Sequence, residues 1–228
     1  MESDAATYLP WFILREIPFL GNLGINRLIQ VFGNPEKALA APPDALKKVP
    51  GISRKSLAGI LHPKKYIPAA QRELQQITQL GITILTLNDA GFPKLLKTIP
   101  DPPPILTCQG TLDPHDPCIA IVGSRNASSY GMDTARYLAR RLAGMGFCIV
   151  SGMARGIDTA AHQGALAAAG KTIAVLGSVL KKIYPCENRD LFYKIQKSGA
   201  VISEFKLDTD PYPYNFPVRN RIIAGLSC

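Results

Sequence analysis

Long hydrophobic runs are missing from this sequence of 228 residues. No stretch approaches the roughly 18–20 consecutive apolar residues that span a bilayer, so we expect no membrane partner. A secretory signal is also missing, because Glu2 and Asp4 stand where a signal peptide carries basic residues. The sequence therefore predicts a cytoplasmic protein.

Cysteine is scarce, and the five cysteines show neither close pairs nor the spacing of a metal site. This usage is typical of a reduced compartment, and we expect no metal. Cys148 falls within an apolar run, where a thiol behaves as a small buried hydrophobe.

Acidic residues are few relative to basic ones. The chain has 17 Asp and Glu against 26 Lys and Arg, with a formal net charge of +9. Such a balance favours nucleic acid or another polyanion as a partner, although it is also compatible with an ordinary soluble protein.

The residues that are present are organised around the stretch 119–158. Ile119–Val122 is a continuous apolar run, typical of a strand buried on both faces of a parallel sheet, and it leads into Gly123. A helical pattern over 132–144 follows, and then a second buried strand, 147–150. Both strands end in small polar turns at the same edge of the sheet, which is where open α/β sheets bind ligands.

The rest of the chain divides into two predicted domains. Residues 1–65 carry short amphipathic helical patterns and form a small all-helical module, and residues 66–228 form an α/β domain. Within the latter, 66–117 comprises an edge βα piece (helix 67–80, strand 82–87) and a proline-rich connector, 89–117. Residues 118–228 form the core, because strands near 119, 148, 172 and 201 alternate with helices, as parallel strands do.

The helical module contains a turn that resembles a helix–hairpin–helix motif. Val49-Pro50-Gly51-Ile52 joins two short helical segments, and Lys47, Lys48, Arg54 and Lys55 flank it. In such turns the glycine lets backbone N–H groups approach a phosphate. A packing module with solvated lysines has the same pattern, so both interpretations stay open.

Two nucleotide motifs are absent in the form that chemistry requires. The loop after Val122 lacks Gly-x-Gly-x-x-Gly, which disfavours a dinucleotide cofactor. Residues 165–172 (ALAAAGKT) match a permissive Walker A pattern, but here the glycine ends a helix and a strand follows. A phosphate-binding loop has the reverse order, so we predict no cofactor.

The turns at the sheet edge offer donors suited to phosphate. Gly123, Ser124, Ser151 and Gly152 expose N–H and hydroxyl groups near helix starts, and Arg125 adds a guanidinium that can bind phosphate in two places.

Asp158 and His162 lie at i, i+4 on one predicted helix. A catalytic pair has this spacing, but a helix-capping carboxylate and a buried histidine have it as well. No nucleophile or second carboxylate is spaced to join them, and we predict no enzymatic activity.

These segments together resemble the DprA (Smf) family of DNA-processing proteins of bacterial natural transformation. The matching segments are IAIVGSR, SGMARGIDTAAHQGAL, TIAVLG, IYP, VISEF and FPVRNRIIAGLS, with GFPKLLKTIPDPPPILTCQG upstream. The resemblance implies an extended Rossmann-like fold behind a SAM-like helical module. It also implies competence-related binding of single-stranded DNA, protection of that DNA, loading of the RecA recombinase, a homodimer and no catalysis.

The sequence departs from the family after Gly177, where Ser178–Lys182 replaces a usual Gly and Asp, and it ends at Cys228, where the family continues. We therefore expect a C-terminally truncated member, with dimerisation and RecA contact dependent on the absent part.

Residues around the sheet edge are the predicted contacts for DNA and its phosphates: Gly123, Ser124, Arg125, Ser151, Gly152, Arg155, Lys181, Lys182, Tyr184, Arg219, Asn220 and Arg221. Tyr184 either stacks on a base or packs under its loop. Arg219 and Arg221 require an anion, which is Glu204, Asp158 or a bound phosphate. The alternative function is a nucleotide-binding, phosphoribohydrolase-like enzyme, although the loop PGGxGTxxE of such enzymes is absent.

Overall fold

The computed structural model describes residues 2–210 and 212–227, which form two compact units. The first comprises residues 1–88 and 100–105, and the second residues 89–99 and 106–228. Residues 66–88 thus group with the first unit by packing, and the domain ranges given above stay a prediction.

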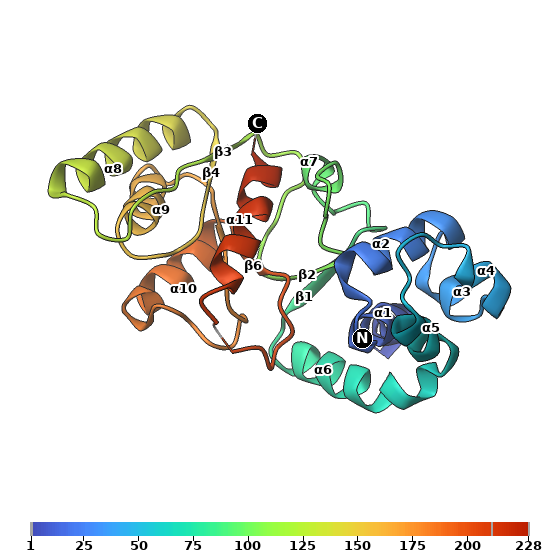
Figure 1. Cartoon of the computed structure of the whole chain (residues 1–228). Helices are drawn as coiled ribbons and strands as arrows, with labels where there is room; N and C mark the ends of the chain where they lie inside the picture. Colours follow the sequence, from blue (N-terminus) through green and yellow to red (C-terminus); the bar gives the residue numbers. More distant parts are fainter. Residues whose placement is uncertain (1, 211, 228) are drawn as a thin grey trace. The chain divides into compact units, whose positions relative to one another are not determined.

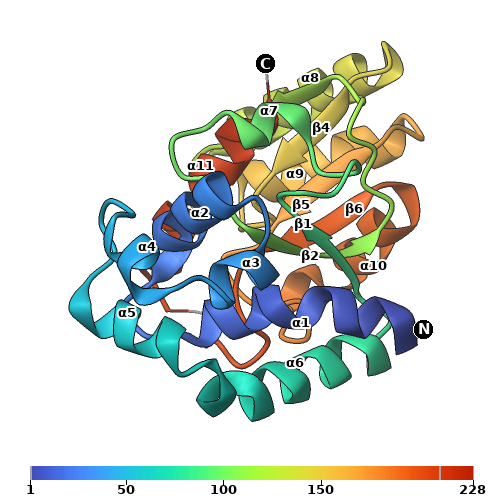
Figure 2. The ribbon, with the colours of Figure 1, turned by 90° about the vertical axis from the view of Figure 1, so that its right-hand side faces the viewer.

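The first unit is mainly helical. Its elements are α1 (Glu2–Glu16), α2 (Gly21–Phe32), α3 (Pro35–Leu39), α4 (Pro43–Lys47), α5 (Arg54–Leu61), the 3-10 turn η1 (Pro63–Tyr66), α6 (Ile67–Gln79) and strand β1 (Thr83–Thr86). Helices α1 and α6 lie along one another (Figure 2). The buried ion pair between Arg15 and Glu73, at 2.6 Å, joins these two helices.

The second unit alternates strands and helices. Its elements are α7 (Lys94–Lys97), β2 (Ile105–Gly110), β3 (Cys118–Ala120), α8 (Ser129–Gly144), β4 (Cys148–Ser151), α9 (Ile157–Ala167), β5 (Thr172–Val175), η2 (Cys186–Asn188), α10 (Arg189–Ser198), β6 (Ala200–Ser203) and α11 (Asn215–Leu226). The mixed α/β class and the alternation expected from residue 119 onward are confirmed.

Five strands form the sheet of this unit in the order β2-β6-β5-β4-β3. The pairs β3–β4, β4–β5 and β5–β6 are parallel, and Cys118 stands opposite Cys148 in the first of them. Strands β4, β5 and β6 are buried along their whole length, as their unbroken apolar runs predict.

The connector expected over residues 89–117 is instead partly regular structure. Strand β2 lies within it and pairs antiparallel with β6, with Cys108 opposite Ile202. Its prolines fall before and after the strand, at 100–104 and at 114 and 117, where no ladder N–H is needed. The proline-rich connector therefore contains a short strand that was not predicted, because its flanking prolines have no strand pattern.

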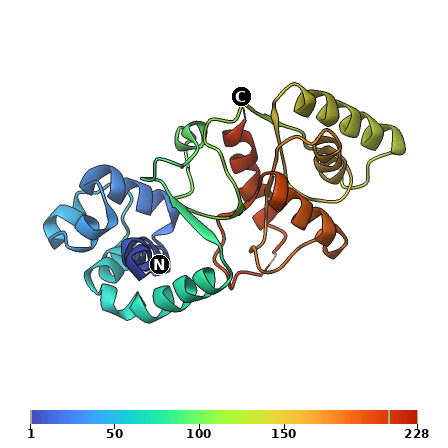
Figure 3. The same cartoon turned by 180° about the vertical axis from the view of Figure 1, so that it is seen from behind.

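Helices cover both faces of this sheet (Figures 1 and 3). Helices α8, α9 and α10 lie on one face, and α11 lies on the other. Between α8 and α9 the core is built from Ala139, Ala143, Ala161 and Ala165 around Ile149. These small side chains let the two helices approach closely, and their N-termini then point toward the loops that follow β3 and β4.

Candidate nucleic-acid interface

Loops from three strands meet at the carboxyl edge of the sheet. They follow β3, β4 and β5, and the beginning of α11 joins them around two adjoining hollows. The first hollow is lined mainly by Arg125, Asn126, Arg155, Tyr184, Pro185 and Phe216. The second is lined mainly by Val122, Gly123, Arg125, Asp158, Arg219 and Asn220. Arg125 and Phe216 line both.

The exposed guanidinium of Arg125, the exposed ring of Tyr184 and the half-buried ring of Phe216 lie together in this site. The Arg125 guanidinium carbon lies 4.7 Å from the centroid of the Phe216 ring, a cation–π contact. The rings of Tyr184 and Phe216 have centroids 5.7 Å apart and are tilted by 46°. No carboxylate of the described residues forms an ion pair with Arg125. Its N–H groups are therefore available to an incoming anion beside two aromatic rings.

The carboxylate of Asp158 lies among the backbone amides of these loops. Asp158 lies in the first turn of α9, and its side chain turns back to accept a hydrogen bond from the N–H of Ala154 at 3.4 Å, with the backbones of Gly123 and Gly152 nearby. The expected helix cap at Asp158 was wrong, because the residue that precedes the helix is Gly156 and the carboxylate accepts from the loop N–H of Ala154 instead. The carboxylate thus lies close to Gly123 and Gly152, whose amides we expected to face a phosphate.

Burial dominates the electrostatics of this carboxylate. The pKa of Asp158 is raised by desolvation, and the positive charge of Arg219 and the nearby backbone amides oppose that rise. Burial in turn lowers the pKa of Arg219 to about 10, against the attraction of Asp158. The two buried groups therefore influence one another by their opposite charges.

Arg219 joins the loop after β4 to the end of β5 by hydrogen bonds. It lies in the second turn of α11, buried, and its Nη1 donates to the carbonyl of Gly152 at 2.8 Å and to the carbonyl of Val175. A side chain at Gly152 would stand 2.5 Å from the guanidinium, so glycine is required there by the arginine's close approach. We expected Arg219 to project toward a phosphate; instead it is an internal support of the site.

His162 is buried on α9 and does not contact Asp158 as a catalytic pair would. The hydroxyl of Thr172 donates to the carbonyl of Ile149 at 2.6 Å, so it must accept from Nδ1–H of His162, 2.7 Å away. This fixes the neutral Nδ1–H tautomer. Nε2 has no hydrogen-bond partner among the described residues, and burial lowers the pKa of the ring to about 3.

Replacing His162 by asparagine is expected to make the free energy of unfolding less dependent on pH below pH 7. The unfolded chain takes up a proton below about pH 6.5 while the folded ring, with its pKa near 3, does not. The free energy of unfolding therefore falls by up to about 1.4 kcal/mol per pH unit as the pH falls through this window. Urea unfolding at pH 7, 6 and 5 measures the loss. Parallel curves for the wild type and H162N would contradict it, and the exposed His62→Asn serves as the control.

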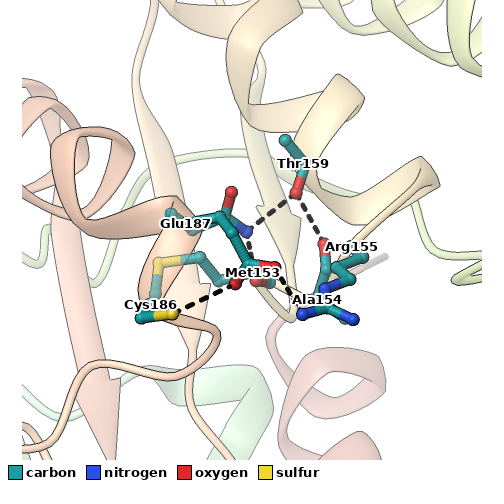
Figure 4. A network of polar contacts seen from close by, with 7 residues as sticks. Met153, Ala154, Arg155, Thr159, Cys186 and Glu187 are labelled. Atoms are coloured by element: carbon teal, nitrogen blue, oxygen red, sulfur yellow. Dashed lines mark hydrogen bonds and ion pairs between the residues drawn. The ribbon is translucent and has the colours of Figure 1, made fainter.

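The loop after β4 is tied to the loop after β5 by the contacts shown in Figure 4. Arg155 forms an ion pair with Glu187, and both side chains are exposed. Asn188 Nδ2 donates to the carbonyl of Met153 and to Thr159 Oγ1, each at 2.8 Å. The buried amide thus sets the loop, whereas the exposed ion pair adds little stability and leaves Arg155 able to exchange partners.

Carboxylates of the protein itself also form ion pairs with the other predicted cations, which are Lys181, Lys182 and Arg221. Lys181 contacts Asp208 and Lys182 contacts Asp210, each at 2.9 Å and exposed. Arg221 contacts the buried Glu204 at 2.5 Å. Of the anions left open for the arginines, the structure therefore places Glu204 beside Arg221 and Asp158 near Arg219.

The structure brings together most of the predicted site residues but not all. Those lining the hollows are Gly123, Arg125, Gly152, Arg155, Tyr184, Arg219 and Asn220. Those outside the linings are Ser124, Ser151, Lys181, Lys182 and Arg221. Ser151 is buried and its hydroxyl donates to the carbonyl of Ile121 at 2.6 Å, so this hydrogen bond stabilises the sheet. The Ser124 hydroxyl accepts from the N–H of Asn126, within its own turn.

Phe216 and Asn126 line the first hollow but were not predicted as site residues. Phe216 begins the segment FPVRNR, and an aromatic residue directly before a proline and a basic run was an available signal. Asn126 carried no such signal, because only the turn after β3 brings its side chain to the first hollow.

Neither a metal centre nor a membrane span is found in the described part of the chain. It contains no group of three or more His, Cys, Asp or Glu side chains placed to hold a metal ion. None of its helices combines the length and apolar character that crossing a bilayer requires.

The family model for DNA recombination-mediator protein A matches residues 83–228. Protein Smf of Synechocystis is 39% identical over 230 residues, covering 99% of this chain and 57% of that protein. The chain spans about half the length of the curated relatives it matches.

Two solved structures are similar. DNA processing protein A (DprA) from Streptococcus pneumoniae has a TM-score of 0.82 at 31% identity, over 97% of this chain and 75% of that one. DNA processing protein A from Helicobacter pylori, described for its single-stranded DNA binding mode, has a TM-score of 0.56 at 33% identity, over 64% and 66%.

Proposed function

The chain belongs to the DNA recombination-mediator protein A family, and on this basis we propose that it binds single-stranded DNA at the two hollows. The observation that carries the proposal is the placement of Arg125, free of any carboxylate among the described residues, against Phe216 and beside Tyr184. A guanidinium for phosphate next to aromatic faces for bases is the combination that single strands require.

The strand would exchange weak internal contacts for phosphate contacts. Arg155 is held by an exposed ion pair with Glu187, and such pairs contribute only about 0–1 kcal/mol. A phosphate can therefore take the place of Glu187 at small cost. Lys181 and Lys182, with exposed carboxylate partners of the same kind, are proposed to contact the strand in the same way beyond the hollows.

The remaining roles are proposals supported by the family resemblance. We propose that the protein takes part in DNA processing during transformation, protects incoming DNA and helps to load RecA. We propose further that it acts in the cytoplasm as a homodimer and by binding rather than by catalysis. The last point is supported by the separate contacts of Asp158 and His162: the carboxylate accepts from the N–H of Ala154, and His162 Nδ1 bonds to the hydroxyl of Thr172.

Arg125→Ala is expected to weaken binding of a labelled oligo-dT by about 5- to 150-fold, which corresponds to about 1–3 kcal/mol for a charge-assisted contact. Fluorescence anisotropy measures the effect, and thermal unfolding should stay at the wild-type midpoint because the side chain is on a loop. Arg141→Ala is the matched control, since Arg141 is exposed in the last turn of α8, at the opposite edge of the sheet. Equal affinity of R125A and wild type would refute the site.

A further inference from the structure

The helical unit carries an exposed basic surface that the two hollows do not include. Residues 45–72 contain seven Lys and Arg and no Asp or Glu. All seven cations are exposed, and among the described residues only Lys47 has an ion pair, with Asp44. A run of cations without compensating carboxylates favours a polyanionic partner.

A tight turn presents part of this charge. Between α4 and α5 the backbone turns at Gly51, whose φ is +75°, a conformation that favours glycine. Arg27 of α2 donates to the carbonyl of Pro50 at 3.1 Å, which brings another cation to the turn. Ile52 also lies against α2, because a Cβ at Gly24 would stand 3.8 Å from its side chain. The turn and the start of α2 therefore form one continuous surface.

An unusual aromatic residue stands on the same surface. Phe19, between α1 and α2, is 72% exposed and has a φ of +63°. A large side chain in the left-handed region costs on the order of 1–3 kcal/mol, and this one gains little burial in return. Lys55 Nζ of α5 lies 4.9 Å from its ring centroid. Strain that holds an exposed ring beside cations is typical of a binding surface.

We propose that Phe19, Arg27, Arg54 and Lys55, with the turn 49–52, form a second contact surface for single-stranded DNA, separate from the hollows. The arginines and the lysine supply charge for successive phosphates, and the exposed Phe19 ring supplies a face on which a base stacks. An unpaired base can reach such a ring, whereas a base within a duplex is already stacked. The partner is therefore a single strand.

The test compares variants of the full chain on an oligo-dT of about 40 nucleotides. Phe19→Asn removes the ring while suiting a positive φ, so the fold is kept. Its affinity should fall by about 5- to 150-fold, the worth of one stacked base. Arg54→Ala with Lys55→Ala should reduce the slope of log affinity against log salt by about 1.4, or about 0.7 for each lost phosphate contact. The exposed pair Lys194→Ala with Lys197→Ala on α10 is the matched control.

Wild-type affinity and salt slope in both variants would overturn the inference. Duplex DNA bound as tightly as the single strand, and weakened equally by Phe19→Asn, would also overturn it. Failure of the proposed function has a different signature. If Arg125→Ala binds as the wild type while the helical-unit variants bind weakly, the hollows are not the site and this surface is.

Discussion

Replacing Arg219 by methionine is expected to lower the free energy of unfolding by about 3–5 kcal/mol, because two buried hydrogen bonds from a charged donor are lost, each worth about 1.5–3 kcal/mol. Methionine keeps most of the volume but leaves Asp158 buried without its neighbouring positive charge. It also leaves the carbonyls of Gly152 and Val175 without the donor that joins their loops. Urea unfolding at pH 7 measures the change, and oligo-dT binding should weaken with it because both loops line the site.

A second substitution identifies the cause. Asp158→Asn removes the buried charge, so the double variant R219M/D158N should recover part of the lost stability. The pH dependence has a definite sign: the pKa of Asp158 is raised in the folded state, and more so without Arg219, so the folded state holds the proton more tightly. The deficit of R219M should therefore shrink as the pH is lowered from 7 toward 5. A constant deficit, or stability equal to the wild type, would contradict this account.

Gly156→Ala is the second change for which we expect a large effect, a loss of about 3 kcal/mol of stability. The backbone at Gly156 has φ +77° and ψ −125°, a combination that residues with a Cβ rarely adopt. A Cβ there would also overlap the carbonyl oxygen of Ser124 and stand 2.9 Å from that of Arg125. Relief requires the loop after β3 to move, so oligo-dT affinity should fall together with the melting temperature.

Gly144→Ala is the matched control for this change. Gly144 is the last residue of α8, and a Cβ there would meet no atom within 4 Å. We expect this variant to melt at or slightly above the wild-type temperature, because alanine reduces the entropy of the unfolded chain. Similar melting temperatures for G156A and G144A would show that the loop accommodates a side chain at little cost.

The architecture from residue 119 onward was predictable because it rests on local patterns. Unbroken apolar runs identify strands buried on both faces, and small residues at helical spacing identify the helices that cover them. Strand β2 escaped because a short strand amid prolines has no distinguishing period. Only its pairing with β6, almost a hundred residues away in the chain, makes it a strand.

The place where the candidate site residues gather was predictable, but their contacts were not. The glycine turns and Arg125 follow strand ends, so the edge of the sheet is implied by the chain order alone. The roles of Arg219 and Asp158 could not be predicted. An arginine on a helix gives the same sequence pattern whether its side chain faces solvent or a neighbouring loop. Both side chains are buried: the carboxylate accepts from the N–H of Ala154, and the guanidinium donates to the carbonyls of Gly152 and Val175.

The distribution of thiols makes this chain convenient for spectroscopy. Cys108, Cys118 and Cys148 are buried, whereas Cys186 is exposed and its Sγ lies 3.5 Å from Glu187, the partner of Arg155. A maleimide dye added to the Cys228→Ser variant should therefore label the loop after β5 selectively. The dye would report directly when a strand replaces Glu187 at Arg155, without any label on the DNA.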